Sequence, residues 1–247
     1  GRYMDNREYI MITGASHGIG KAAAFAFARR GYRVLAISRN LDGGLDKLQQ
    51  DIQKNLETEC LILAGDIGKE TFVQKIFKFL SAHGQLKALV NNAGISHVGL
   101  LQNMLLEEWN QLFQTNVTSM FLTCRAAIPI FLTQGEGSIV NVSSVWGNVG
   151  ASCETAYSAT KGAINALTHA LAKELAPSRI RVNAAAFGVV DTSMNQIFSP
   201  AERVALTKKI PMGRFGTMDE AADLLLDLAL NHPYLTGQVI TMDGGWL

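Results

Sequence analysis

Tyr157 and Lys161 carry the side chains best suited to acid–base chemistry in this chain, and Ser144 lies thirteen positions before the tyrosine. Residues four positions apart share one face of a helix. An ammonium close to a phenol favours the phenolate, so we expect Lys161 to lower the pKa of Tyr157 from its ordinary value of about 10. Such a phenol is a competent general acid or base for a carbonyl and alcohol pair, and Ser144 could hold the carbonyl oxygen from the other side. Because Tyr-x-x-x-Lys also occurs on solvated helices by chance, the interpretation depends on the rest of the chain.

A glycine-rich turn, Thr13–Gly20, follows the first predicted strand and opens a helix of small residues at Lys21–Arg30. Glycines let the backbone approach a pyrophosphate, and a helix N-terminus offers N–H donors and a favourable dipole. The spacing is G-x-x-x-G-x-G rather than the commoner G-x-G-x-x-G. A plain strand-to-helix connection is the alternative, but the position of the turn favours dinucleotide binding. The predicted contacts are Gly14, Ser16, His17, Gly18, Ile19 and Gly20.

The end of the second predicted strand, Ser38-Arg39-Asn40, bears on the choice of nicotinamide cofactor. An acidic residue at this place would accept hydrogen bonds from the adenosine ribose and select NAD. Ser38 does not repel a 2′-phosphate, and Arg39 can pair with one and stack on adenine. We therefore predict NADP(H) over NAD(H), the alternative being that Arg39 is an ordinary solvated charge.

Short apolar runs rich in β-branched residues alternate with longer helical patterns along the chain. This alternation is typical of a parallel sheet covered by helices on both faces. With right-handed crossovers, it predicts an α/β fold with a Rossmann-type doubly wound parallel sheet of about seven strands. The predicted strands are residues 9–13, 33–38, 60–64, 88–92, 138–143, 180–186 and 238–242. The predicted helices are residues 18–30, 41–55, 69–83, 105–133, 154–175 and 218–230.

The chain length of 247 residues fits one α/β domain, which we place at residues 5–247. Residues 1–4 are interpreted as a disordered or cloning-derived end, because Met4 resembles a native start. The least regular stretch, residues 188–216, contains Pro200 and Pro211 and is predicted to be a mobile flap of short helices.

The composition excludes several classes of protein. Hydrophobic residues make up 48% of the chain and charged residues 17%, which argues against disorder. The net charge is +1 without a basic block, so we expect no nucleic-acid partner. Charges interrupt each apolar stretch before the ~20 residues of a membrane span, and the N-terminus lacks the apolar core of a signal peptide. The three cysteines lack metal-ligand spacing, so we predict reduced thiols in a cytoplasmic protein without a metal site.

Taken in order along the chain, the motifs resemble the short-chain dehydrogenase/reductase family from about Glu8 to the C-terminus. The set is very specific at this order and spacing, although no single motif is. The resemblance implies an NAD(P)-dependent enzyme that interconverts an alcohol and a carbonyl compound. The residues that carry it are Thr13-Gly14-x-x-x-Gly18-Ile19-Gly20, Asn91-Asn92-Ala93-Gly94, Asn116, Ser144, Tyr157-x-x-x-Lys161 and Asp243-Gly244-Gly245.

The resemblance also implies a role for each matching position. Tyr157 matches the catalytic acid–base residue, and Lys161 matches the residue that lowers its pKa and binds the nicotinamide ribose. Ser144 matches the substrate-orienting hydroxyl, and Asn116 matches the asparagine that supports a helix kink and holds a water in a proton relay. The implied cofactor contacts are Asp66 and Ile67 at the adenine, Asn92, Ala93 and Gly94 at the adenosine ribose, and Gly188, Val190 and Thr192 at the nicotinamide.

One departure from the family pattern is Phe187-Gly188 after the sixth strand, where Pro-Gly is usual. Proline stiffens such a turn, so Phe187 puts the nicotinamide geometry and the rate in question. Glu154, three positions before Tyr157, is interpreted as favouring the helix dipole rather than contacting substrate. The predicted walls of an apolar substrate pocket, with core or flap packing as the alternative, are Trp146, Val149, Met194, Ile197 and Phe198.

Within the family, Ile210–Gly216 and Tyr234–Gly237 are most similar to the 3-oxoacyl-[acyl-carrier-protein] reductase branch. An acidic carrier protein requires a basic docking patch, yet the loop Gln134–Gly137 is not basic, which leaves Arg125, Arg179 and Arg181 as weak candidates. The alternative is a general ketone reductase or a dehydrogenase of a sugar, steroid or alkaloid-type alcohol. A non-catalytic NADPH-binding scaffold is disfavoured by the intact catalytic residues. We expect a homotetramer or homodimer formed through the two longest helices.

Overall fold

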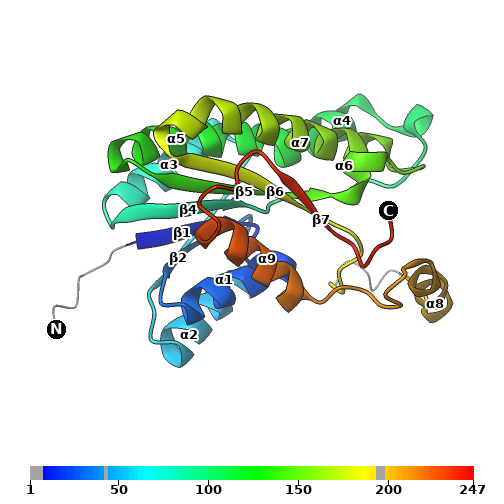
Figure 1. Ribbon diagram of the computed structural model, residues 1–247, viewed down its shortest axis with the longest axis horizontal. Helices are drawn as coiled ribbons and strands as arrows, with labels where there is room; N and C mark the ends of the chain where they lie inside the picture. The colour runs from blue at the N-terminus through cyan, green and yellow to red at the C-terminus, as the bar shows by residue number, and fades with distance from the viewer. Residues whose placement is uncertain (1–7, 42–43, 193–197) are drawn as a thin grey trace.

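The computed structural model describes residues 8–41, 44–192 and 198–247, which form an all-parallel sheet in the strand order β3-β2-β1-β4-β5-β6-β7 (Figure 1). Helices cover both faces of the sheet, which confirms the predicted doubly wound architecture. The strands are β1 (Glu8–Thr13), β2 (Arg33–Ser38), β3 (Cys60–Ala64), β4 (Gln85–Asn91), β5 (Gly137–Ser144), β6 (Ile180–Phe187) and β7 (Val239–Met242).

The strand order reverses between β1 and β4. The chain builds β1, β2 and β3 outward in one direction and then returns to place β4 on the other side of β1. Connections that leave neighbouring parallel strands in opposite directions open a crevice at the carboxyl ends of those strands. Thr13 and Asn91 end β1 and β4 at this point, so the glycine-rich turn and the Asn-Asn-Ala-Gly turn face each other across it.

One face of the sheet is covered by helices from both ends of the chain (Figure 1). They are α1 (Gly18–Arg29), α2 (Gly44–Asn55) and α9 (Met218–Leu230). Ala23, Ala24 and Phe27 of α1 are fully buried against the sheet and α9. The small side chains let α1 lie close to the sheet, which directs the N-terminus of α1 at the crevice.

The opposite face is covered by α3 (Glu70–Ser81), α4 (Leu106–Phe113), α5 (Ser119–Gln134) and α7 (Thr155–Leu175). The sequence predicted one continuous helix over residues 105–133. The structure instead has a π-helical turn, Gln114–Thr118, between α4 and α5. Asn116 lies in this turn, and its side-chain amide forms hydrogen bonds with the backbone N–H and carbonyl groups of Ile95. A wider π turn is a common way to place a functional side chain inside a long helix.

Short helices complete the fold and lie near the carboxyl edge of the sheet. Ser144 caps α6 (Val145–Val149), since its Oγ accepts a hydrogen bond from the Trp146 backbone N–H at 3.1 Å. Within the irregular stretch at 188–216, α8 (Pro200–Lys209) begins with a capping box between Ser199 and Glu202. Single 3₁₀ turns occur at Leu101–Asn103 and Ala176–Ser178.

Among the described residues, one helical run, Leu106–Gln134, is long and apolar enough to cross a membrane by length and composition alone. Half of its most apolar window is buried inside the protein. Core helices of proteins without any membrane contact pass the same test, and here α5 packs on the sheet with Ala127 and Phe131 fully buried.

Candidate active site

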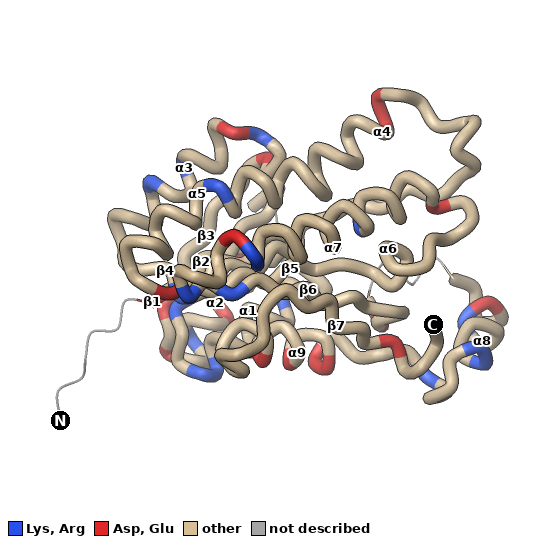
Figure 2. The backbone as a smooth tube through the Cα atoms, turned by 45° about the horizontal axis from the view of Figure 1, so that its top comes forward, with Lys and Arg blue, Asp and Glu red and all other residues tan. Residues whose placement is uncertain are grey.

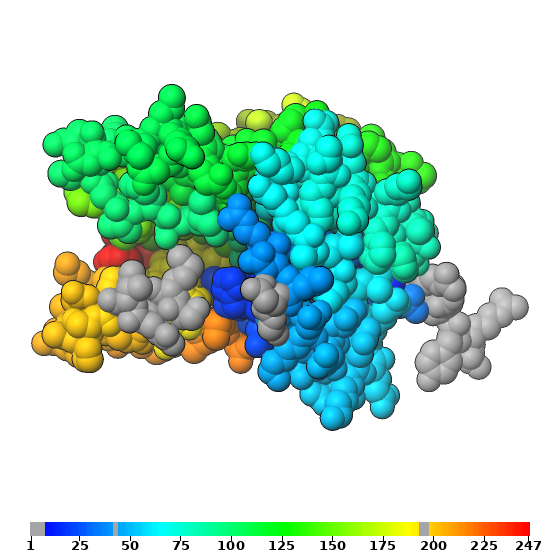
Figure 3. Space-filling view, turned by 180° about the vertical axis from the view of Figure 1, so that it is seen from behind, coloured from blue at the N-terminus to red at the C-terminus, as the bar shows by residue number. Residues whose placement is uncertain are grey.

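A cavity of about 1190 Å³ opens at the carboxyl ends of β1, β4, β5 and β6. Seen from behind, the surface is hollowed between the green residues that follow β4 and the yellow residues around α8, and red C-terminal residues are visible in the hollow (Figure 3). Its walls contain the glycine-rich turn, Ser144, Tyr157 and Lys161. The structure therefore brings the predicted dinucleotide turn and the predicted acid–base residues into one space.

Ser144 and Tyr157 reach the cavity from two different elements. Ser144 ends β5, and Tyr157 and Lys161 lie in the first two turns of α7. Gly147 of α6 allows α6 and α7 to approach, because a Cβ at this position would lie 2.7 Å from the Lys161 carbonyl carbon. The neighbouring Ser143 points to the other side, where its hydroxyl donates to Asn165 at 2.6 Å. Of the two consecutive serines, only Ser144 contacts the phenol of Tyr157.

The pKa of Tyr157 departs from the sequence-based expectation. Burial raises this pKa to about 12, the hydrogen bond with Ser144 opposes the rise, and the nearby Glu154 carboxylate adds to it. We expected Lys161 to lower the pKa. Desolvation of the phenolate is instead the largest effect, and the ammonium nitrogen of Lys161 lies 5.5 Å from the centre of the phenol ring.

Lys161 is almost fully buried, and its Nζ donates a hydrogen bond to the carbonyl oxygen of Val142 at 3.1 Å. Burial lowers the pKa of Lys161 to about 8. A Cβ built on Gly94 would lie 3.7 Å from the Lys161 nitrogen. The ammonium thus sits between β5 and the turn after β4, at the wall of the cavity.

Asn116 is fully buried and does not line the cavity. Its Oδ1 accepts from the Ile95 N–H at 2.8 Å, and its Nδ2 donates to the Ile95 carbonyl at 2.8 Å and to Thr160 Oγ1 at 3.2 Å. Asn116 therefore joins the loop after β4 to α7 between Tyr157 and Lys161. This geometry is that of a positioning residue.

The glycine-rich turn fits a dinucleotide pyrophosphate. Gly14 and Gly18 have φ values of +65° and +60°, which L side chains rarely adopt. Gly20 does not line the cavity but supports the turn, since a Cβ there would lie 2.2 Å from the Gly14 carbonyl oxygen. The Asn92 amide donates to that same oxygen at 3.0 Å. Glycines at these positions leave the backbone N–H groups at the start of α1 open to an anion.

A polar cluster lies where the adenosine ribose of a dinucleotide would be expected. Ser38 Oγ donates to Ser16 Oγ at 2.9 Å, and Ser16 Oγ lies 2.8 Å from His17 Nδ1. The Arg39 guanidinium is largely exposed and lies 3.8 Å from Asp66. All five side chains belong to residues that line the cavity, so this end offers hydroxyl and cationic donors.

Most of the remaining predicted contacts also line the cavity. Trp146 and Phe198 do so, whereas Val149 is exposed and does not, which corrects its assignment to the pocket wall. Met194 and Ile197 lie outside the described residues. Phe187 is buried against the core beneath α9 and contributes to the cavity wall. The others that line it are Ile19, Ile67, Ala93, Gly94, Gly188, Val190 and Thr192.

Among the cavity-lining residues that sequence reasoning missed are Trp246 and Leu206, which come from the C-terminus and from α8. From the sequence, Glu154 is interpreted as favouring the helix dipole of α7 rather than contacting substrate. Glu154 is the N-cap residue of α7, but its side chain makes no capping hydrogen bond, and it lines the cavity instead. The acidic residue one turn before Tyr157 was a sequence signal from which the position of Glu154 in the cavity could have been inferred. No feature of the sequence indicated that the C-terminal Trp246 lines the cavity.

The three cysteines are free thiols, with Cys60 and Cys124 buried and Cys153 half-buried. Burial raises the pKa of the Cys60 and Cys124 thiols to about 12, so neither is a reactive thiolate. Across the described residues, no group of three or more His, Cys, Asp or Glu side chains could hold a metal ion.

Comparisons with known proteins agree on one family. A family model described as short chain dehydrogenase matches residues 8–203. The human 3-oxoacyl-[acyl-carrier-protein] reductase is 41% identical over 235 residues and covers 95% of each chain. An uncharacterized oxidoreductase of Bacillus subtilis, YmfI, is 38% identical and covers 96% of this chain and 97% of its own. A crystal structure of 3-oxoacyl-[acyl-carrier protein] reductase from Brucella melitensis matches with a TM-score of 0.91 at 32% identity, over 97% of this chain and 91% of that chain.

Proposed function

Because the chain belongs to the short-chain dehydrogenase family and is an NAD(P)-dependent oxidoreductase, we propose that it uses NADPH to reduce a carbonyl compound to an alcohol. The observation that supports this proposal most strongly is that the Tyr157 phenol and the Ser144 hydroxyl meet in the cavity that also contains the glycine-rich turn. A phenol at this place can donate its proton to a carbonyl oxygen. A 3-oxoacyl thioester is the first substrate class to test.

In the proposed reaction, the glycine-rich turn, Ser38 and Arg39 would hold NADPH, which would supply a hydride to the carbonyl carbon. Tyr157 donates its phenolic proton to the carbonyl oxygen, which becomes the alcohol hydroxyl. Ser144 accepts from the Trp146 N–H, and its own O–H, which contacts the Tyr157 phenol in the free protein, can turn to donate to the carbonyl oxygen as negative charge develops. The Lys161 ammonium, 5.5 Å from the centre of the phenol ring, stabilises the phenolate that remains, and a proton from solvent restores the phenol.

The preference for NADPH is supported by the polar cluster at the end of β2. Ser38 and Ser16 offer hydroxyls and Arg39 offers a guanidinium, while no carboxylate of a described residue occupies the strand end itself. Asp66 lies opposite Arg39 at 3.8 Å, a long and solvent-screened pair. Arg39 can therefore leave this pair for the stronger charge of a 2′-phosphate.

The proposal that the substrate is a 3-oxoacyl thioester is supported by two similar proteins. The human relative and the Brucella protein of known structure are both named 3-oxoacyl-[acyl-carrier-protein] reductase. The basic residues predicted for carrier-protein docking do not surround the cavity. Arg125 pairs with Glu70 at 2.6 Å, and Arg179 and Arg181 lie at the end of β6 opposite the cavity. The helix α8 borders the cavity through Leu206, and its last turn carries Lys208 and Lys209 (Figure 2). We propose α8 as the surface on which a carrier protein would dock.

The test is turnover of NADPH and of NADH, followed by loss of nicotinamide absorbance, with acetoacetyl thioesters and simple ketones. We expect NADPH-dependent reduction in which Tyr157→Phe lowers kcat at least 10³-fold while the Kd for NADPH changes little. Arg39→Ala should raise the KM for NADPH at least tenfold and leave the KM for NADH unchanged. Cofactor binding without turnover on any carbonyl would refute the catalytic proposal and favour an NADPH-binding scaffold, and turnover of ketones alone would refute the thioester.

We also propose self-association through the helical face formed by α4 and α5. The exposed large apolar side chains on this face are Leu105, Leu106, Phe121 and Leu132. Light scattering after size exclusion should give a mass that is a multiple of 26.7 kDa, and the pair Phe121→Asp and Leu132→Asp should reduce it to that of one chain. A monomeric wild-type protein at micromolar concentration would contradict the proposal.

A further inference from the structure

Glu154 places a carboxylate in the substrate side of the cavity. It lies three positions before Tyr157, at the N-cap of α7, and lines the same cavity as Ser144 and Trp146. Its carboxylate is partly desolvated, which raises its pKa, and it is close enough to Tyr157 to disfavour the phenolate. A negative charge close to the Tyr157 phenol interacts electrostatically with any substrate that enters the cavity.

The Glu154 carboxylate has no polar partner among the described residues. Within the described part of the chain, no hydrogen bond or ion pair is made by its side chain, and it caps no backbone N–H of α7. The cations that line the cavity are engaged elsewhere: Lys161 donates to Val142, and Arg39 lies beside Asp66. Desolvating a carboxylate without a partner costs free energy, and a cation on the substrate would offset that cost.

An aromatic pair lines the same cavity next to Ser144, which accepts a hydrogen bond from the Trp146 N–H. Trp146 and Trp246 meet edge to face with ring centres 5.1 Å apart, and both line the cavity. The C-terminal tail is held in place by Asp243, whose two carboxylate oxygens accept from the N–H groups of Gly245 at 2.9 Å and Leu247 at 2.8 Å. Tryptophan is the side chain that attracts cations most strongly through its ring face.

We propose that Glu154, together with the Trp146–Trp246 pair, binds a protonated amine carried by the substrate, so that the preferred substrate of this enzyme is an amino ketone. The inference rests on the proposed carbonyl reduction and favours a ketone over a 3-oxoacyl thioester as its substrate. The ketone carbon lies between Ser144 and Tyr157, and the ammonium lies against Glu154 and the tryptophan rings. An acyl thioester carries no positive charge near its carbonyl group and gives Glu154 no such partner.

The test compares 5-(dimethylamino)pentan-2-one with its neutral isostere 6-methylheptan-2-one. The two ketones have the same shape, and the tertiary amine is protonated at neutral pH and cannot form a cyclic imine. We expect the wild-type kcat/KM to favour the amino ketone at least tenfold. Glu154→Gln keeps the shape and the acceptor oxygen but removes the charge, and should bring the ratio of the two kcat/KM values close to one. Glu107→Gln, an exposed acid at the start of α4, is the matched control and should keep the wild-type ratio.

A binding measurement separates this inference from the proposed reaction. N,N-dimethylpentylamine has no carbonyl group, and its binding to the NADPH-loaded protein can be followed by tryptophan fluorescence. We expect Glu154→Gln to raise its Kd at least tenfold. Equal kcat/KM values for the two ketones in the wild type, or a preference that survives Glu154→Gln, would overturn the amine site while leaving the reductase proposal intact. Amine binding that depends on Glu154 in a protein that reduces neither ketone nor an acetoacetyl thioester would support the site and refute the reaction.

Discussion

Lys161 shows how a functional side chain opposes stability. A buried ammonium whose pKa is lowered from 10.5 to about 8 destabilises the folded state by roughly 3 kcal/mol at neutral pH. The unfolded chain binds more protons than the folded one between these two values. The free energy of unfolding therefore increases as the pH rises from 8 to 10.5, because the penalty for burying the ammonium falls. Below pH 8 this penalty is fully present.

We predict that Lys161→Met increases the free energy of unfolding at pH 7 by about 2 kcal/mol, after loss of the hydrogen bond to Val142, while reductase activity is lost. The advantage of the variant should shrink as the pH rises toward 10. Urea unfolding at pH 7, 8 and 9.5 measures both effects. A variant less stable than the wild type at pH 7 would mean that the ammonium is solvated or paired in the folded protein.

Gly20 tests the close packing of the pyrophosphate turn. An alanine Cβ there would lie 2.2 Å from the Gly14 carbonyl oxygen and 2.5 Å from the Asn92 amide, so the turn must move. We predict that Gly20→Ala raises the Kd for NADPH at least tenfold in a fluorescence titration. The control is Gly162→Ala in α7, where the nearest atom is 3.7 Å away. It should leave the Kd unchanged and stabilise the helix by about 0.5–1 kcal/mol. Equal affinity in both variants would mean that Gly20 does not shape the turn.

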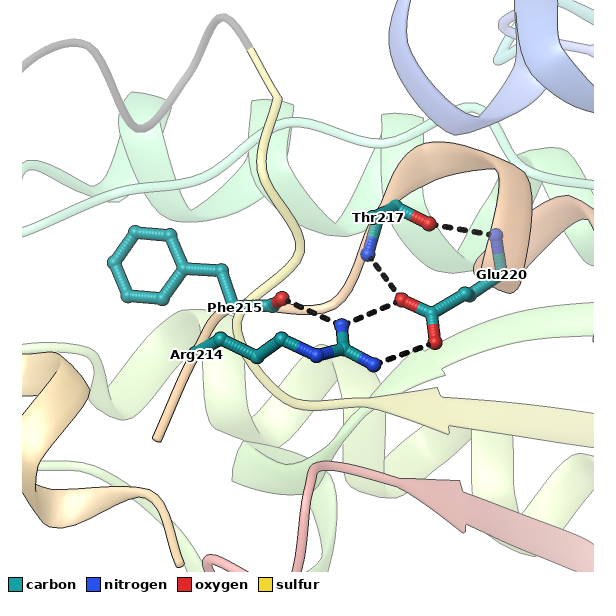
Figure 4. Close-up of polar contacts among 4 residues, drawn as sticks. All are labelled: Arg214, Phe215, Thr217 and Glu220. Carbon is teal, nitrogen blue, oxygen red and sulfur yellow. Dashed lines mark hydrogen bonds and ion pairs between the residues drawn. The ribbon is translucent and has the colours of Figure 1, made fainter. Parts of the chain in front are cut away.

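The connection from α8 to α9 is fixed by one ion pair at the start of α9. Arg214 donates two hydrogen bonds to Glu220, at 2.7 and 2.9 Å, and Glu220 also accepts from the Thr217 N–H at 3.0 Å (Figure 4). The hydrogen bonds from Arg214 are the main reason why the pKa of Glu220 falls to about 2. The adjoining Phe215 is buried beneath the Arg203 guanidinium. These contacts hold one end of the segment that borders the cavity.

We predict that Glu220→Gln accelerates tryptic cleavage within α8 several-fold, because the neutral amide cannot pair with both nitrogens of Arg214. Asp219→Asn, which changes the neighbouring acid and leaves the pair intact, should not. Since the lowered pKa contributes stability above pH 4.5 that is lost as the pH falls toward 2, resistance of the wild type to acid proteases should persist at pH 4. Equal cleavage rates for the two variants would assign the anchoring of this segment to other contacts.

The π turn at Gln114–Thr118 has a related role on the other side of the cavity. It directs Asn116 inward to bind both peptide groups of Ile95. A continuous α-helix would rotate this side chain by part of a turn and leave those groups buried without partners. The helix is interrupted where the loop after β4 must be held against α7.

The whole molecule has two apolar cores that share one sheet. One lies under α1, α2 and α9, and the other under α3, α5 and α7. The strands β1 to β6 contribute side chains to both cores, as Ile10 and Met11 of β1 do, whereas β7 contributes Ile240 and Met242 to the first core. Neither layer can be lost without exposing the sheet on which the other packs, and we propose that the chain is a single domain.

We predict one cooperative unfolding transition for this domain. Urea curves followed by far-UV circular dichroism, which reports the helices, and by fluorescence of Trp146 and Trp246, which reports the cavity, should have the same midpoint. The double variant Trp146→Phe and Trp246→Phe, in which Trp109 is the remaining fluorophore, checks that the signal comes from the cavity. Separate midpoints would divide the chain into independent units.

The sequence by itself determined the parallel sheet and the order of the site motifs, because apolar periodicity, turn glycines and the four-residue spacing of Tyr157 and Lys161 are local properties. It did not determine the pKa of Tyr157, because burial depends on what the rest of the chain packs around the phenol. It did not place Trp246 against Trp146 either, since residues a hundred positions apart meet only when β7 joins the sheet beside β6. The tertiary structure decided that the Glu154 carboxylate lines the cavity without capping α7, because the path of the chain before α7 sets where this side chain lies.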